Sequence, residues 1–186
     1  MARVTVQPET FAMVRFDADV IERWAGEVAD RVGLPDDTEI HIVIDEASPL
    51  ARWAVTDGEP ITITVDGGAF EDTRRPREMG RRRTTDVVGR ALLRVLDRRS
   101  EAFADAPPDD ELTLAQSVAW DVYSVGRLAR LSEHSGQRQR RLYQFRNRHG
   151  FTDAADAAFD QLWTAEKLTW SAIKGISEEA LSALPA

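Results

Sequence analysis

One amphipathic helix, predicted from Thr84 to Arg99, constrains the fold of this chain more than any other segment. At 100° per residue its apolar side chains gather on one side, which must pack against another element of structure. These side chains are Val88, Ala91, Leu92 and Val95. The opposite side presents a ladder of charged residues within about 80° of one another, namely Asp86, Arg90, Arg94 and Asp97.

The segments before this helix predict a small sheet with one further helix. Alternating apolar residues indicate strands at Arg3 to Gln7 and Glu39 to Asp45, and an apolar stripe indicates a helix from Asp17 or Asp19 to Val32. Two more strands, Arg52 to Val55 and Ile61 to Val65, are joined through Asp57-Gly58 and predict a hairpin. The connection EDTRRPREMGRRR is too charged for a core, so we expect it on the surface.

The segment DAPPDD at residues 105–110 predicts a boundary, because two prolines prevent the helix from continuing. Beyond it the sequence is helical: Leu114 to Leu131, a basic helix ending near Asn147, a helix from Asp153 to Trp170 and a short one from Ser177. We therefore expect an α+β protein with about four strands. Its two parts would be residues 1–104, an α/β core, and residues 109–186, a helical segment packed on that core.

Composition excludes several classes of function. The 186 residues include no cysteine, which rules out disulfides, thiolate metal sites and cysteine nucleophiles. No apolar run is long enough for a membrane span or a secretory signal, so we expect a cytoplasmic protein without a membrane partner. The net charge of −8 argues against nucleic-acid binding over the whole surface, but ten arginines lie within residues 74–99 and seven within 127–148.

The order helix, strand, hairpin, arginine-rich loop, helix over residues 17–99 resembles the minimal zincin-like metallopeptidase family. The segments ERWAGEVADRVGLPDD, IHIVIDEASPL and ITITV are similar to that family, in which a small sheet packs against the helix that carries HExxH. Within the helix, DVVGRALL aligns with HExGHALL. The resemblance therefore places Asp86 and Arg90 where two zinc-binding histidines belong, and Val87 where the glutamate base belongs.

Zinc peptidases need two imidazoles on one helical face and a carboxylate that activates water, so the resemblance implies a degenerate, non-catalytic member without metal or cofactor. It would be retained for binding a protein or peptide, with an exposed strand edge as the natural docking site. The charged ladder then has three interpretations: a solvated face with pairs Asp86 to Arg90 and Arg94 to Asp97, a former active-site cleft filled by an ion pair, or an anion-binding use of the two arginines. The solvated face is the simplest.

An arginine-dependent nucleic-acid or anion-binding protein is the alternative. In GQRQRRLYQFRNRHG (Gly136 to Gly150), five arginines interleave with aromatic residues, a mixture that can pair with phosphates and stack on bases. The candidate residues are Arg138, Arg140, Arg141, Tyr143, Arg146 and Arg148, helped by Arg81, Arg82 and Arg83. Leu142, Phe145 and His149 share a helical face, however, so a packed helix with solvated arginines is the simpler interpretation.

The remaining motifs are weak. Gly175, Ile176 and Ser177 match the turn of a helix-hairpin-helix element, although ordinary helix capping is the simpler explanation. The three histidines, His41, His134 and His149, have no metal-binding spacing, and a dinucleotide, Walker or nucleophile-elbow motif is missing from the sequence. The acidic pair Asp45-Glu46 is expected at a turn.

Overall fold

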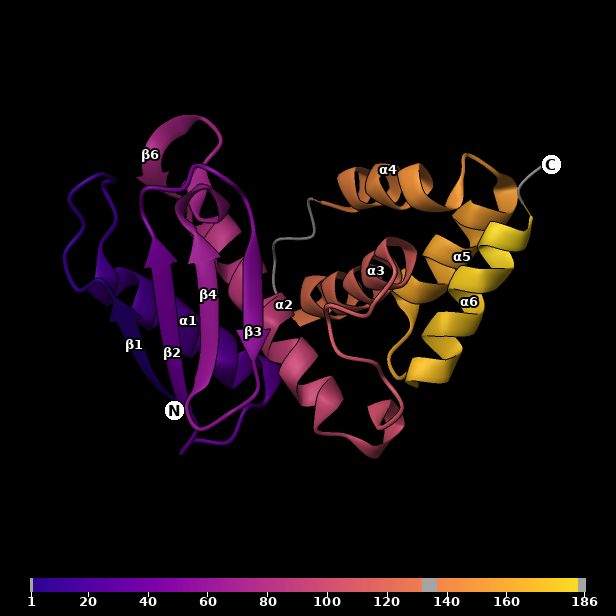
Figure 1. Cartoon of the computed structure of the whole chain (residues 1–186), viewed down its shortest axis with the longest axis horizontal. Helices are drawn as coiled ribbons and strands as arrows, with labels where there is room; N and C mark the ends of the chain where they lie inside the picture. The colour runs from indigo at the N-terminus through magenta and orange to yellow at the C-terminus, as the bar shows by residue number, and fades with distance from the viewer. Residues whose placement is uncertain (1, 132–136, 184–186) are drawn as a thin grey trace. The chain divides into compact units, whose positions relative to one another are not determined.

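The computed structural model describes residues 2–131 and 137–183, and it confirms an α+β protein with a helical C-terminal region (Figure 1). The chain divides into two compact units, Met1–Leu96 and Asp97–Ala186. This division lies inside helix α2, Arg81–Arg98, rather than in the proline-containing segment at residues 105–110. His134 and the expected helix break at Ser135-Gly136 lie outside the described residues.

The first unit is built on a four-stranded sheet. Its strands are β1 (Arg3–Gln7), β2 (Glu39–Asp45), β3 (Trp53–Thr56) and β4 (Ile61–Asp66), in the spatial order β1-β2-β4-β3. The strands β1, β2 and β4 run parallel, and β3 pairs antiparallel with β4 as the predicted hairpin. Consequently β3 forms one edge of the sheet.

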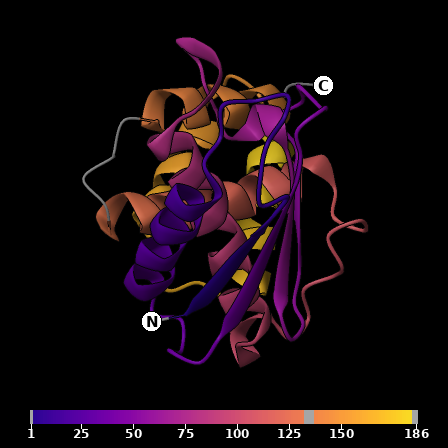
Figure 2. The same ribbon diagram turned by 90° about the vertical axis from the view of Figure 1, so that its left-hand side faces the viewer.

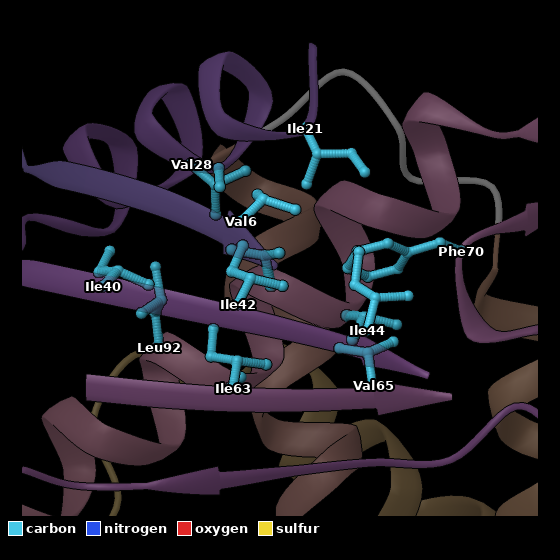
Figure 3. Close-up of a cluster of buried hydrophobic side chains, with 14 of the residues drawn as sticks. Val6, Ile21, Val28, Ile40, Ile42, Ile44, Ile63, Val65, Phe70 and Leu92 are labelled. Carbon is cyan, nitrogen blue, oxygen red and sulfur yellow. The ribbon is translucent and has the colours of Figure 1, made fainter. Parts of the chain in front are cut away.

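Both helices of the first unit cover the same face of this sheet (Figure 2). In register, Ile40, Ile42 and Ile44 of β2 lie beside Ile61, Ile63 and Val65 of β4, so six buried side chains share that face. Against them pack Ile21 and Val28 of α1 (Ala18–Val32) and Leu92 of α2 (Figure 3). The four apolar residues predicted for the inner side of α2, Val88, Ala91, Leu92 and Val95, are all members of this core.

The ends of α1 follow from local chemistry. The side chain of Asp17 accepts a hydrogen bond from Val20 N, and Gly33 ends the helix in a left-handed conformation with φ of 81°. A side-chain acceptor at the first position and a glycine at the last are the usual caps, which is why the sequence predicted both boundaries.

The arginine-rich connection lies on the surface as expected, but it is more ordered than the sequence indicated. It forms a second small sheet of β5 (Glu71–Asp72) and β6 (Arg75–Met79), after a 3-10 turn at Gly67–Ala69. Arg77 in this hairpin has a φ of 64°, which is uncommon for a residue other than glycine. Helix α2 then begins at Arg81, not at Thr84, so Arg81, Arg82 and Arg83 are helical. Its first turn has no acidic residue, and the usual signal for a helix start is missing.

The second unit is helical. It contains a 3-10 turn at Glu101–Phe103 and the helices α3 (Leu114–Leu131), α4 (Arg138–His149), α5 (Asp153–Thr164) and α6 (Trp170–Ser182). Its core joins Phe103 and Trp120 to Phe145, Phe159 and Ile173. Among the described helices, none combines the length and the apolar character that a membrane span requires.

Two predicted boundaries in the second unit are wrong. The helix expected from Asp153 to Trp170 ends at Thr164, and α6 begins at Trp170 with Thr169 as its capping residue. The Gly175-Ile176-Ser177 segment is neither a turn nor a cap, because it lies inside α6. Helix α6 continues through Gly175 because Ile173, Ile176 and Ala180 supply a buried face that outweighs the low helix propensity of one glycine.

Candidate functional site

The candidate site is the outer edge of β3. The backbone N–H of Asp66 donates to the carbonyl of Arg52 over 3.0 Å, which makes Arg52 and Asp66 a hydrogen-bonded pair of the antiparallel ladder. Such pairs alternate along an antiparallel ladder, so Ala54 and Thr56 also direct their backbone groups toward β4. Trp53 and Val55 therefore direct two N–H and two C=O groups away from the sheet. Within the described residues no hydrogen bond satisfies them.

A side chain of α2 contacts β3 on the face of the sheet that the helices cover. The guanidinium of Arg90 lies 5.0 Å from the centre of the Trp53 ring, and its Nη2 contacts the Asp86 carboxylate at 3.2 Å. The side chains of Arg90 and Asp86 are only 10% and 14% exposed. A guanidinium over an indole ring in a place largely screened from water is a favourable contact of about 1–2 kcal/mol. The pair thus fixes the orientation of Trp53 on the edge strand.

The interpretation of the charged ladder as a solvated face is wrong. Arg90, Arg94 and Asp97 are 8%, 4% and 5% exposed, so three of its four residues are buried. The predicted Asp86 to Arg90 pair is present. Asp97 lies in the second unit. Its carboxylate accepts hydrogen bonds from both Nη atoms of Arg127, at 2.8 and 2.6 Å, and from Nε1 of Trp120 at 2.8 Å. Helical spacing shows which residues share a side, but not what covers that side.

The position that the family resemblance assigns to a catalytic base is part of the hydrophobic core. Val87 is 4% exposed and packs with the residues between α2 and the sheet. The described residues contain no group of three or more histidine, aspartate or glutamate side chains that could hold a metal ion.

A hollow of about 380 Å³ lies near the carboxyl ends of β2 and β4, a place where parallel sheets often bind ligands. Its acidic residues are Asp45 and Asp66, which lie side by side in the parallel register. Asp66 accepts from Nε of Arg52 at 2.8 Å, and Asp45 accepts from the backbone N–H of Ala47. Both carboxylates therefore serve the local fold, which agrees with the structural role expected for Asp45.

Glu46 has a similar role in the fold. Its Oε2 accepts hydrogen bonds from the backbone N–H groups of Ala12 and Met13, at 2.9 and 2.6 Å. This carboxylate connects the loop after β1 to the end of β2, which agrees with a structural role for the Asp45-Glu46 pair.

The arginines of α4 are divided between internal partners and solvent. Arg138 forms an ion pair with Asp160, and Arg146 holds Asp156 through two bonds of 2.7 and 2.5 Å. Arg141 is 9% exposed. Arg140 and Arg148 remain exposed, and Tyr143 is 59% exposed. The apolar face predicted for this helix is present, since Phe145 and His149 are fully buried.

The arginines at the start of α2 also have local roles. Arg81 forms a 2.7 Å ion pair with Glu27 of α1, and Arg83 donates to the carbonyls of Gly68 and Ala69. Arg82 is exposed. Arg81 and Arg83 are therefore bound within the fold and are not presented to an anionic ligand.

Sequence reasoning missed one buried polar pair. Nε2 of His149 lies 2.8 Å from Ser177 Oγ, and Nδ1 of His149 lies 3.2 Å from the carbonyl of Phe145. Because the carbonyl accepts from Nδ1–H, the neutral imidazole accepts the serine O–H at Nε2. Burial lowers the pKa of His149, and the bond to the Phe145 carbonyl opposes that shift. The pair joins α4 to α6, and no helical periodicity could reveal it.

No family model, no curated protein and no solved structure matches this chain. The resemblance to the zincin-like family therefore stays a prediction from the sequence.

Proposed function

We propose that the first unit is a non-catalytic, metallopeptidase-like domain that binds an extended segment of a protein partner at the edge of β3. The observation that carries this proposal is the pair of residues, Trp53 and Val55, whose backbone groups point away from the sheet. An extended peptide laid along them would continue the sheet, with main-chain hydrogen bonds as the source of affinity. We expect this protein to act in the cytoplasm.

The contacts behind the edge support a role in recognition. In the proposed relationship to zinc peptidases, Asp86 and Arg90 occupy the positions of the metal ligands. Their ion pair and the contact of Arg90 with Trp53 take over the task of ordering the edge strand. A rigid edge loses less conformational entropy when it binds a peptide than a mobile one does.

The decisive variant is Val55→Pro, because proline removes one outward N–H while leaving the bonds from Ala54 and Thr56 to β4 in place. The probe is a synthetic peptide selected from a random linear library against the full chain. We expect Val55→Pro to weaken its binding at least about tenfold, the effect of about 1.4 kcal/mol. Binding is measured by fluorescence polarisation, and hydrogen exchange should show protection of residues 53–56 in the complex.

Two control variants separate edge pairing from a loss of packing. Val55→Ala removes a similar apolar contact but keeps the N–H, so peptide affinity should change little. Ala54→Pro removes an N–H that faces β4, so the free energy of unfolding should fall instead. Equal binding by Val55→Pro and the unmodified chain, or a library that yields no binder, would refute edge pairing.

A separate measurement tests the absence of catalysis. Protein purified without added metal should contain no stoichiometric zinc by elemental analysis and should not cleave the selected peptide. Stoichiometric zinc would overturn the non-catalytic proposal. Arg90→Met tests the positioning role: it should raise the hydrogen-exchange rate around Trp53 in the ligand-free chain and weaken peptide binding.

The alternative of nucleic-acid binding through all the predicted arginines receives less support. Arg81, Arg138 and Arg146 pair with carboxylates, and Arg83 binds two backbone carbonyls. On α4 a smaller set of the predicted residues is exposed, namely Arg140, Tyr143 and Arg148.

A further inference from the structure

We propose that α4 and the turn after it bind single-stranded nucleic acid through a surface that we call the aromatic patch. This patch consists of Arg140, Tyr143 and Phe151, all in the second unit, and Arg146, which pairs with Asp156, borders it. Single exposed apolar residues are common on protein surfaces, but two large aromatic rings in contact are a more specific feature.

The rings of the patch are open to solvent and touch each other. Tyr143 is 59% exposed and Phe151 is 64% exposed. Their centroids lie 6.0 Å apart at an interplanar angle of 69°, so the edge of one ring meets the face of the other. Such an arrangement leaves ring surface on which a planar ligand can stack.

The cations next to these rings are of two kinds. Arg146 is held by its two bonds to Asp156, and its guanidinium lies 5.9 Å from the centre of the Phe151 ring. Arg140, three residues before Tyr143, lies on the same side of α4. Arg140 is exposed and forms no ion pair or hydrogen bond with any residue that the structure describes.

Charge and shape together identify the class of ligand. Helix α4 has five arginines and no acidic residue, so its exposed guanidinium groups favour a polyanion. Phosphate oxygens accept charge-assisted hydrogen bonds from guanidinium groups, and unpaired bases stack their flat faces on aromatic rings. In a duplex the bases are already stacked on one another, and an acidic peptide has charge but lacks such rings. A single strand uses both parts of the patch.

The test is binding of a fluorescein-labelled, mixed-sequence 20-nucleotide single strand to the full chain at a series of salt concentrations. Tyr143→Ala and Phe151→Ala should each raise the Kd about fivefold or more, the range found when one aromatic ring that stacks on a base is removed. Arg140→Ala should instead flatten the dependence of log Kd on log salt concentration, by about 0.7 for each phosphate that the variant no longer binds.

Matched controls come from the same unit. Leu114 is 64% exposed and lies on α3, so Leu114→Ala removes an equally exposed apolar side chain outside the patch. Lys167→Ala removes one exposed positive charge between α5 and α6. Both variants should bind the single strand as the unmodified chain does. All the altered side chains are exposed, so the far-UV circular dichroism spectrum should stay unchanged.

Three results would overturn the proposal. The first is no detectable binding of the strand at low salt. The second is binding that the Tyr143→Ala and Phe151→Ala variants retain in full. The third is equal affinity for a duplex of the same sequence or for poly-glutamate, since neither offers unstacked bases and charge alone would then explain the binding.

Discussion

Replacement of Asp97 should strongly destabilise the second unit. It is 5% exposed, and its carboxylate accepts three hydrogen bonds, two from Arg127 and one from the indole of Trp120. The Arg127 guanidinium also lies 3.9 Å from the centre of the Tyr123 ring. A buried charge is tolerated only where paired groups replace water, so each member of this cluster depends on the others.

The expected magnitudes follow from this dependence. Asp97→Ala leaves a largely buried guanidinium and an indole N–H without their carboxylate acceptor, which should lower the free energy of unfolding by about 3–5 kcal/mol. Arg127→Met keeps an apolar stem against Tyr123 but removes the charge that pairs with Asp97. The double variant should be more stable than the sum of the two losses predicts, by about 2–3 kcal/mol, because it removes both charges.

The assay is urea unfolding of the full chain, followed by far-UV circular dichroism at several protein concentrations. Hydrogen exchange along α3 shows whether the second unit is the part that loses stability. As a control, Asp160→Ala breaks the ion pair with Arg138, whose side chains are 60% and 41% exposed, and it should cost less than about 1 kcal/mol. If the double variant loses the full sum of the two single losses, the two charges are not coupled and the reasoning is refuted.

Two further predictions concern His149 and the glycines. Burial lowers the pKa of His149 below its ordinary value of 6.5, so the unfolded chain takes up a proton first as the pH falls. The free energy of unfolding should therefore decrease below about pH 6.5, by at most about 1.4 kcal/mol per pH unit, and His149→Gln should remove this contribution between pH 6.5 and 5.5 in urea titrations. Gly68→Ala should destabilise the first unit, because its Cβ would lie 2.0 Å from the carbonyl oxygen of Pro49. Gly175→Ala, with no heavy atom within 4 Å of the added Cβ, should raise the free energy of unfolding by about 0.5–1 kcal/mol; thermal melts in which both variants shift in the same direction would contradict this pair.

The elements predicted best are those with a strict period and clear ends. Strand β2 spans Glu39–Asp45 as expected, because its alternating isoleucines face a core on one side. Helix α1 begins after Asp17 and ends before Gly33, as its caps indicated. The order of the strands in the sheet was not predicted. Parallel pairing of β1 with β2 depends on long-range contacts that periodicity does not encode.

The errors arise where tertiary contacts overrule local signals. Arg81 to Arg83 are unfavourable at a helix start, yet Glu27 and the carbonyls of Gly68 and Ala69 bind two of these arginines. The candidate site was predicted in part. The sequence indicated a strand edge and the Asp86 to Arg90 pair, but not that Arg90 stacks on Trp53 or that Trp53 and Val55 carry the outward backbone groups.

Two residues spaced i, i+4 on a helix can carry metal ligands or an ion pair, and at Asp86 and Arg90 the spacing carries an ion pair. Two positive unit charges 4 Å apart repel by about 4 kcal/mol at an effective dielectric constant of 20, and a divalent ion doubles that cost. At 3.2 Å from the carboxylate of Asp86, the guanidinium of Arg90 occupies the region that such an ion would need. A cation could bind only by displacing that guanidinium from both Asp86 and the Trp53 ring, which would remove the side-chain contact that orients Trp53. A bound cation next to Asp86 and the contact of Arg90 with Trp53 therefore exclude each other in this chain.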